Sequence, residues 1–397
     1  MNSSQKVKFA CFAIEGLNSF STILYFNYLY FLMHAKFGFS DQQNLALAAL
    51  LGSIYAIAAW QGGRIAHRLG YFNTLKLGFG IMILAWLVGA QLTSAPALVV
   101  AACIANIGMC LTWPTLEALV SEGESAANVP RVVGIYNIVW AVTYAGAFFV
   151  GGRLIDDFGF KAIFYIPAGV MAGQMALAFW LEHHASELKR ATAKQPTAPA
   201  LPPDPHRPSP AKAKAFLRMA WLANPFAYIA INTLIAVLPG VAAKLHLSTS
   251  IAGVVCSLWC FARLAAFVVL WRWSGWHYRF RWLLVAFGLL VTAFVAILTV
   301  PVLSVILLAQ LLFGGAIGLI YYSSLYYSMD VSEVKSEHGG IHEAAIGLGN
   351  CLGPAVGALS LQFAARSADS AALGVAGLLS FGLAALVWIQ INSREHR

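Results

Sequence analysis

The sequence has little charge. Only 10% of its 397 residues are Asp, Glu, Lys or Arg, whereas 60% are hydrophobic. An ordinary soluble domain carries about 25% charged residues, so this composition excludes a soluble enzyme, a secreted disulfide scaffold and a nucleic-acid-binding domain. The chain length is therefore counted in membrane-spanning segments, each of which takes about 20 residues. The composition therefore predicts an all-α polytopic membrane protein.

The sequence also lacks the motifs of several chemistries. Its six cysteines form no Cys-x-x-Cys pair and all fall in apolar runs, where free Cys acts as a small apolar residue. Cys256 and Cys260 share a helix face, but no further ligands accompany them, so we expect no metal site. No Walker-type phosphate loop, His-Glu-x-x-His motif or Gly-x-Ser-x-Gly elbow occurs. We expect neither an enzyme nor a bound cofactor.

What the sequence does contain is twelve apolar runs, each long enough to cross a membrane. The first is followed by no small-residue cleavage site, so we expect it to remain as a span. The runs cover residues 8–35, 43–63, 73–93, 97–120, 131–153, 161–181, 217–243, 249–272, 281–300, 303–328, 340–363 and 372–391.

A hydrophilic stretch divides the runs into six and six. Residues 183–215 hold seven of the 15 prolines together with several Lys and Arg residues. Proline at this density favours an extended, semi-rigid tether. We therefore predict an N-terminal six-helix bundle over residues 1–182, a cytoplasmic linker over 183–215 and a C-terminal six-helix bundle over 216–397.

The basic residues are distributed unevenly among the loops. If the N-terminus lies inside, nineteen Lys and Arg residues fall in inside segments and Arg263 falls within a span. An excess of positive charge marks the cytoplasmic side, so we expect both termini in the cytoplasm and the chain in the inner membrane. The net charge of +9 then reflects the basic residues of the cytoplasmic segments, and we expect no nucleic-acid partner. Five basic residues fall outside: Lys36, Arg153, Lys161, Lys244 and Arg366.

The two halves carry traces of a duplication. A shift of 208 residues aligns Lys36 with Lys244 and Ser40 with Ser248, after the first and seventh runs. A shift of 206 aligns Gly134 with Gly340 and Gly151 with Gly357, in the fifth and eleventh. These identities fall at matching places in the span order, as a duplicated six-helix unit predicts.

Two short motifs occur in this framework. The loop after the second run, residues 63–70, reads Gly-Arg-Ile-Ala-His-Arg-Leu-Gly and includes Gly63, His67, Arg68 and Gly70. The eleventh run carries Gly349, Gly353, Pro354 and Gly357, with the spacing Gly-x-x-x-Gly-Pro-x-x-Gly. Small residues at this spacing let helices approach closely, and the proline bends its helix. Simple packing and a flexing interface both fit the second motif.

With the 6+6 layout and the charged linker, these motifs make the whole chain resemble the major facilitator superfamily. The resemblance implies twelve transmembrane helices in two pseudo-symmetric six-helix bundles. It also implies a cytoplasmic latch, in which an Asp of the first motif meets the start of the eleventh helix. His67 stands in place of that Asp, so the latch is expected to be altered. In exporters of the family the second motif lies in the fifth span, which leaves the direction of transport open here.

Four ionisable side chains fall inside predicted spans: Glu15, Glu117, Arg263 and Glu343. Each costs about 2.5–3.5 kcal/mol to insert, so such groups are normally paired or line a watery cavity. Arg263 cannot lose its proton and needs a carboxylate, a substrate anion or water.

A surplus of three acids over one base favours a protonated carboxyl group in a low-dielectric site. We therefore predict proton coupling by Glu15, Glu117 and Glu343. Alternatives remain for each: a permanent Glu15–Arg263 pair that ties helices together, a helix-start role for Glu343 and a solvated end position for Glu117.

Polar and aromatic residues near these charges recur at helical spacing and should turn away from lipid. Hydrogen bonding between helices would give the same spacing without any ligand. In the superfamily the first, fourth, seventh and tenth helices surround a central cavity, and several of these residues fall on them. The predicted substrate-binding residues are Arg263, Asn18, Thr22, Asn106, Trp113, Trp140, Tyr144, Asn232, Gln310 and Tyr321.

These features predict a secondary active transporter that moves a small organic solute by alternating access, coupled to protons. Arg263 favours a solute with an anionic group. Two alternatives stay open: a proton-driven exporter of amphipathic compounds, as in drug efflux, and a membrane receptor or scaffold without net transport. The expected partners are the solute, protons and the lipid bilayer, and we expect a monomer.

Overall fold

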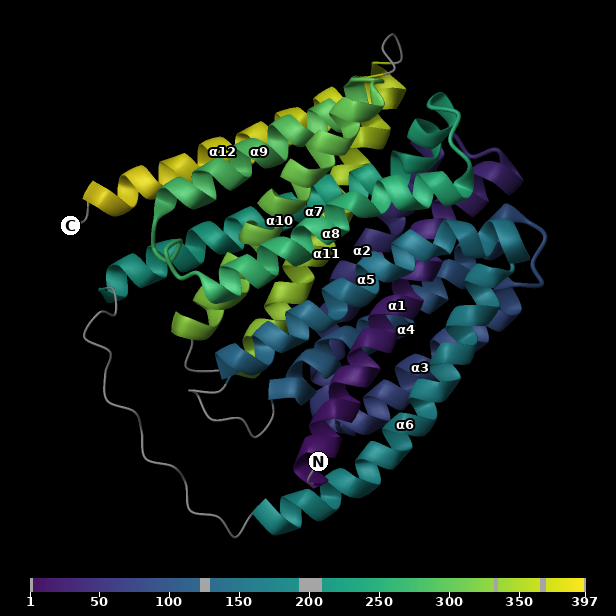
Figure 1. The fold of residues 1–397 in the computed structure, drawn as a ribbon, viewed down its shortest axis with the longest axis vertical. Coiled ribbons are helices and arrows are strands. Elements are labelled where there is room, and N and C mark those ends of the chain that lie inside the picture. The colour runs from purple at the N-terminus through teal and green to yellow at the C-terminus, as the bar shows by residue number, and fades with distance from the viewer. Residues whose placement is uncertain (1–2, 122–128, 193–208, 332–334, 365–368, 396–397) are drawn as a thin grey trace.

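The computed structural model describes residues 3–121, 129–192, 209–331, 335–364 and 369–395. Within these ranges the chain forms twelve α-helices and no β-strand, and each predicted apolar run overlaps one helix (Figure 1). The helices are α1 (Ser3–Phe37), α2 (Asp41–Leu69), α3 (Tyr71–Gly89), α4 (Ala95–Ser121), α5 (Val129–Phe158), α6 (Ala162–Thr192), α7 (Pro210–Lys244), α8 (Thr249–Arg272), α9 (Phe280–Thr299), α10 (Leu303–Val331), α11 (Lys335–Phe363) and α12 (Ser370–Glu395).

All twelve helices are long and apolar enough to cross a membrane. The longest, α1 and α7, have 35 residues each, well above the roughly 20 that a perpendicular span requires. Such helices tilt or extend beyond the hydrocarbon. The twelve-span architecture predicted from the sequence is confirmed.

The turns of the two halves repeat at the shift of 208 residues. Ser40 and Ser248 each cap the following helix, accepting a hydrogen bond from the backbone N–H three residues on. Gly38 and Gly70 have positive φ, and so do the residues 208 positions later, His246 and Tyr278. A non-glycine residue at positive φ is uncommon, so this agreement indicates a shared turn geometry rather than shared sequence. The duplication therefore extends from the end of α1/α7 through the whole of α2/α8.

Four helices, α1, α3, α7 and α9, pack mainly within their own half. In the first half α1 packs against α5 and α6, and α3 packs against α4 and α6. In the second half α7 packs against α10, α11 and α12, and α9 packs against α10 and α12. The most extensive contacts between the halves are α5 with α8 and α2 with α11. We call these the α5–α8 seam and the α2–α11 seam.

The two ends of the helix bundle differ. We call the end at which α6 stops and α7 starts the linker side, and the opposite end the far side. On the linker side the ends of α6 and α7 lie far apart, and the two halves diverge toward this side (Figure 1).

Each seam is tied by polar side chains at its far-side end. In the α5–α8 seam the Asp156 carboxylate accepts hydrogen bonds from the Ser250 hydroxyl at 2.5 Å and the Ser250 backbone N–H at 3.1 Å. In the α2–α11 seam Gln42 donates to Gln362 at 3.5 Å. The shift of 208 residues pairs Gln42 with Ser250, and the shift of 206 pairs Asp156 with Gln362. The two seams are therefore equivalent by the duplication, although their residues differ.

Two sequence predictions require correction, the loop after the second run and the helix start at Glu343. Residues 63–69 are not a loop, because α2 continues to Leu69 and the chain turns at Gly70. The predicted linker, residues 183–215, begins and ends in helix, because α6 continues to Thr192 and α7 begins at Pro210, capped by Ser209. Residues 193–208 lie outside the described part, so the linker stays a prediction. Glu343 is not at a helix start, because α11 begins at Lys335.

Candidate functional site

Arg263, on α8, is buried in the α5–α8 seam among aromatic rings. Its guanidinium carbon lies 4.6 Å from the ring centre of Trp140, 4.5 Å from Tyr144 and 4.9 Å from Trp259. The side chain is 2% exposed, and its Nε and Nη2 make no hydrogen bond. Among the described residues it forms no ion pair, so the alternative of a Glu15–Arg263 pair is not what the structure contains. The aromatic faces hold the cation by cation–π attraction.

Neighbouring polar groups fix the rings around Arg263. The Trp140 indole N–H donates to the Asn137 side chain, one turn earlier on α5, at 2.9 Å. The Tyr144 hydroxyl accepts a hydrogen bond from Asn27 of α1 at 3.4 Å. On α10, Gly314 lies directly against the Trp259 carbonyl oxygen, where any Cβ would collide with it. This glycine lets α10 approach α8 closely beside Arg263.

The aromatic residues continue from Arg263 toward α7. The Trp140 ring packs against Tyr321 of α10 with centroids 5.4 Å apart. Tyr321 in turn lies 6.4 Å from Tyr228 of α7. Four helices, α5, α8, α10 and α7, thus contribute to one aromatic cluster between the halves.

The three predicted acids gather in a second cluster. Glu15 on α1 is fully buried, and neither of its oxygens makes a hydrogen bond of ordinary geometry, although the Tyr136 hydroxyl of α5 lies close by. Glu117 of α4 and Glu343 of α11 lie within electrostatic range of Glu15 and of each other. The structure therefore brings together the three residues that the sequence predicted for proton coupling. Their function itself stays a prediction.

Glu343 is the member of this cluster that connects the halves. The Tyr55 hydroxyl, on α2, donates to the Glu343 carboxylate at 2.5 Å across the α2–α11 seam. The backbones are tightly packed here, because Gly52 of α2 lies against the main chain of Asn350 and Cys351. One turn away, Gly347 of α11 lies against Ala56. We call Glu15, Glu117 and Glu343 the acid cluster.

Two tyrosines lie close to both the acid cluster and Arg263. Tyr228 and Tyr321 are each within electrostatic range of Arg263 on one side and of Glu117 and Glu343 on the other. Arg263 itself lies in the α5–α8 seam and Glu343 in the α2–α11 seam. The buried cation and the buried acids thus share these two tyrosines as neighbours.

The other predicted binding residues divide into helix contacts and unpaired amides. Asn106 donates to the Leu51 carbonyl oxygen at 2.7 Å, so it ties α4 to α2. Thr22 donates to the carbonyl oxygen of Asn18 in its own helix at 2.8 Å. Asn18 is fully buried with neither amide atom hydrogen-bonded, and the Gln310 Oε1 also lacks a partner.

Asn232 and Trp113 make contacts of other kinds. Asn232, half-buried on α7, donates to the side chain of Asn350 at 2.5 Å, which joins α7 to α11. Trp113 is half-buried on α4 and packs against the hydrophobic core. Hydrogen bonding between helices thus explains Asn106, whereas Asn18 and Gln310 retain free amide groups that a ligand could use.

The second motif packs α11 inside its own half. Gly349 and Gly353 lie against backbone oxygens of α7, at Pro225 and Ile229. Gly357 contacts Leu45 of α2 at the α2–α11 seam, and Pro354 is buried in α11. Close helix packing is therefore observed, and the flexing role stays a prediction.

The first motif lies at the linker-side end of α2. Gly63 and Gly70 have nothing within 4 Å of a would-be Cβ, whereas the neighbouring Gly62 lies against the Cys110 carbonyl oxygen of α4. His67 and Arg68 are exposed. The side chains of residues 335–342, at the start of α11, lie outside the described part, so the predicted latch is not tested.

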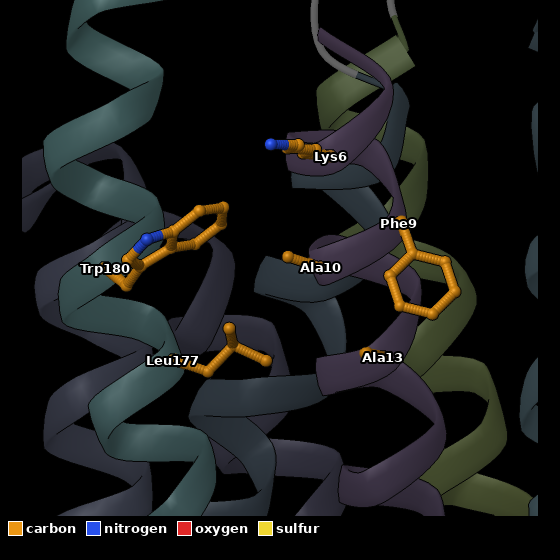
Figure 2. Close-up of a pocket in the computed structure, with 6 residues that line it drawn as sticks. All are labelled: Lys6, Phe9, Ala10, Ala13, Leu177 and Trp180. Carbon is orange, nitrogen blue, oxygen red and sulfur yellow. The ribbon is translucent and has the colours of Figure 1, made fainter. Parts of the chain in front are cut away.

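A groove of about 450 Å³ lies between α1 and α6 near the linker side (Figure 2). None of the predicted binding residues lines it. Its exposed Phe9 and half-exposed Trp180 place it on the outer surface of the bundle rather than between the halves. The groove is lined by Lys6, Phe9, Ala10, Ala13, Leu177 and Trp180.

Sequence reasoning missed three residues that complete the site. Tyr55 binds Glu343, Tyr136 lies beside Glu15, and Trp259 forms one wall of the Arg263 cage. Trp259 and Arg263 are four residues apart on α8, a spacing that puts them on one helix face. That spacing was a usable signal for Trp259. Tyr55 and Tyr136 sit among ordinary apolar residues and gave none.

Comparison with known proteins identifies the family. A sequence model of the Major Facilitator Superfamily matches residues 9–357. The methylenomycin A resistance protein of Streptomyces coelicolor is 28% identical over 118 residues, which are 30% of this chain and 25% of that protein. An uncharacterised MFS-type transporter of Mycobacterium tuberculosis is 28% identical over 156 residues, 38% of this chain and 24% of that protein. The chain thus matches about a quarter of the length of each of these relatives.

Solved structures share the fold over nearly the whole chain. The human organic anion transporter MFSD10 has a TM-score of 0.68 at 16% identity, covering 97% of this chain and 100% of that one. The nucleoside transporter NupG gives 0.69 at 14%, covering 96% and 99%. A bacterial homologue of the human drug peptide transporters gives 0.67 at 14%, covering 100% and 98%. At these identities the likeness concerns the fold, and together with the family match it shows that this chain is a member of the major facilitator superfamily.

Proposed function

We propose that this protein is a proton-coupled secondary transporter that moves a small organic solute with an anionic group by alternating access. The observation that carries the proposal is the separation of buried charges. Among the described residues Arg263, in one seam, forms no ion pair, and three carboxyl groups lie near one another elsewhere in the protein. Unneutralised charges in hydrocarbon are costly and mark substrate and ion pathways.

Arg263 supports an anionic group on the solute. A guanidinium always carries its charge and binds carboxylates and phosphates through directed N–H groups. Its unpaired Nε and Nη2 are donors that a solute anion would satisfy. The rings of Trp140, Tyr144 and Tyr321 offer flat apolar surface for the rest of the solute.

The acid cluster supports coupling to protons. Three neighbouring carboxyl groups cannot all be ionised at low dielectric, so at least one holds a proton. A carboxyl group that exchanges its proton between the two sides of the membrane links proton flow to the rocking of the halves.

The orientation in the membrane follows from charge. Nineteen of the 25 basic residues fall on the linker side of the topology, which we propose to be cytoplasmic. Both termini and the linker then face the cytoplasm, the chain sits in the inner membrane, and the protein works as a monomer of two six-helix halves. In this orientation Figure 1 shows the halves diverging toward the cytoplasm.

A proton-driven exporter of amphipathic compounds is the second candidate. One relative is named for resistance to methylenomycin A, although it shares only a short aligned stretch with this chain. The aromatic cluster around Trp140 and Tyr321 would also suit an amphipathic compound.

Proton flux into proteoliposomes distinguishes these candidates. Liposomes loaded with a pH-sensitive dye are tested with a panel of aliphatic and aromatic carboxylates, nucleosides, dipeptides and cationic dyes. The proposal predicts proton movement with at least one anionic solute and its loss in Arg263→Ala. Proton movement with cationic dyes alone favours the exporter. No proton movement and no solute flux with any compound favours a receptor or scaffold.

A further inference from the structure

We propose that Glu343 is the carboxyl group that takes up and releases the coupled proton, and that Tyr55 is the residue that positions it. The Tyr55–Glu343 hydrogen bond then acts as the proton-sensitive contact between the halves. This inference rests on the proposed function and assigns the proton to one place within it.

The duplication gives both residues of this contact an equivalent position in the other seam. The shift of 208 residues pairs Tyr55 of α2 with Arg263 of α8, and the shift of 206 pairs Glu343 of α11 with Asn137 of α5. The turns at both ends of α2 and α8 keep the first shift, as the paired positive φ angles show. Equivalent positions in the two seams therefore hold a phenol and a carboxyl group in one, and a guanidinium and an amide in the other.

The two equivalent pairs respond differently to protons. Arg263 keeps its charge at all accessible pH values, and the Asn137 amide, which accepts from Trp140, does not titrate. Glu343 can change its charge by binding a proton. Of these two pairs, the one in the α2–α11 seam is thus the one that proton binding can alter.

Among the three acids, Glu343 differs in its hydrogen-bond donor, which comes from the other half of the protein. Glu15 and Glu117 belong to helices of the first half, α1 and α4. Glu343 belongs to the second half, and its hydrogen bond at 2.5 Å comes from Tyr55 of the first. A proton on Glu343 therefore acts directly on a bond between the two bodies that must rock against each other.

The strength of that bond depends on protonation. Hydrogen bonds to an ionised carboxylate are shorter and roughly twice as strong as bonds between neutral groups. Deprotonated Glu343 holds α11 to Tyr55 of α2, and protonation leaves a weaker neutral bond. Since Gly52 and Gly347 pack backbone against backbone in the neighbouring turns of this seam, a change in this bond moves the helices rather than intervening side chains. Proton uptake thus loosens the α2–α11 seam.

Other ionisable groups face Glu343 from the surrounding helices. Electrostatic neighbours come from α1, α2, α4, α5, α7 and α10, and like charges on the other acids oppose simultaneous ionisation of all three. A test must therefore separate Glu343 from the remaining acids. These neighbours are Glu15, Tyr55, Cys110, Glu117, Tyr136, Tyr228 and Tyr321.

A distance measurement across the linker side tests the proposal without knowing the solute. Fluorophores are placed by genetically encoded residues at Asn73, at the start of α3, and at Ser274, between α8 and α9. Both sites are exposed and lie in different halves. Energy transfer is recorded in lipid nanodiscs from acidic to alkaline pH for the unaltered protein, Tyr55→Phe, Glu343→Gln and Glu15→Gln. Tyr25→Phe is the matched control, because it removes a buried hydroxyl that makes no hydrogen bond.

We expect the distance to change with pH in the unaltered protein, in Tyr25→Phe and in Glu15→Gln. The change should be absent in Glu343→Gln and about threefold smaller in Tyr55→Phe, since the charge-assisted bond is lost. A full pH response in Glu343→Gln, a Tyr55→Phe response equal to that of Tyr25→Phe, or no pH response in the unaltered protein would overturn the inference. If one of these occurs while a pH gradient still drives solute flux, the proposed function stands and the proton acts elsewhere. Absence of gradient-driven flux with every solute overturns the function itself.

Discussion

The α5–α8 seam and the α2–α11 seam stabilise their buried ionisable groups in different ways. In the first, a permanent cation lies under three aromatic rings, and in the second a carboxyl group accepts a hydrogen bond from a phenol. The seams occupy equivalent places in a duplicated fold, so the difference comes from side chains rather than architecture. A cation that cannot lose its charge suits binding of an anion, and a group that can lose its charge suits a switch.

The comparison also explains why both groups tolerate burial. Aromatic faces attract the Arg263 guanidinium without adding negative charge, which leaves the site as a whole cationic. The Tyr55 hydroxyl satisfies one oxygen of Glu343 in either protonation state. Among the described residues neither group is neutralised in a buried ion pair, so under the proposed function each stays available, one for a solute and one for a proton.

The largest expected effect comes from changing the cation of the α5–α8 seam. Arg263→Lys keeps the charge but loses the planar group that lies against three rings and offers directed donors. We expect solute-coupled proton flux to fall about tenfold or more. Arg153→Lys, at an exposed α5 site paired with Asp157, is the control and should leave the flux unchanged. Equal flux in the two variants would remove Arg263 from the binding site.

A bulky residue at Gly52 should open the α2–α11 seam. The added side chain would collide with the main chain of Asn350 and Cys351, and overpacking of this kind costs about 1–3 kcal/mol. We expect Gly52→Val to unfold at lower temperature than the unaltered protein in a thermal scan in detergent. Gly146→Val, on α5 with nothing within 4 Å of its would-be Cβ, should behave normally. Equal melting of both variants would show that the seam is not tightly packed.

The far-side ties of the two seams should differ in strength. Asp156→Ala removes two hydrogen bonds to Ser250, whereas Gln362→Ala removes one contact of 3.5 Å. Weakening a far-side tie favours the conformation in which the linker side closes. In the Asn73/Ser274 distance measurement we expect about a threefold population shift for Asp156→Ala and a smaller one for Gln362→Ala. The reverse order would contradict the strength assigned to the α5–α8 tie.

A surface ion pair away from both seams should matter least. Lys76 and Glu182 join α3 to α6 at 2.9 Å, with Glu182 41% exposed. Exposed pairs contribute about 0–1 kcal/mol. We expect Lys76→Gln to change neither the pH response of the distance nor the proton flux, and to lower thermal stability slightly. A large change in flux would show that interactions within one half also control the seams.

The sequence was sufficient for the architecture because hydropathy alone fixes helices in a membrane. Each apolar run of about 20 residues has one stable form there, an α-helix. The ends of the helices were harder, since α2 continues through the first motif and α6 through polar residues to Thr192. A helix can continue beyond the hydrocarbon of the membrane. The end of an apolar run therefore shows where the chain leaves the hydrocarbon, not where the helix ends.

The site was only partly accessible to sequence reasoning. Arg263 and Glu15 stood out because ionisable groups are rare in spans, and the structure buries both. Asn106 shares the spacing of a cavity residue but donates to the Leu51 carbonyl, a partner that no sequence pattern reveals. Tyr55 acquires its role from a contact 288 residues away in the chain. Such partners depend on how the halves dock.

The central claim is that the anion and the proton are handled in different seams. It is tested by measuring, in the same proteoliposomes, accumulation driven by a pH gradient and solute exchange without a gradient, using the solute that moves most protons in the panel. We predict that Glu343→Gln loses accumulation but keeps exchange, whereas Arg263→Lys loses both. Normal accumulation in Glu343→Gln, or normal exchange in Arg263→Lys, would contradict the account.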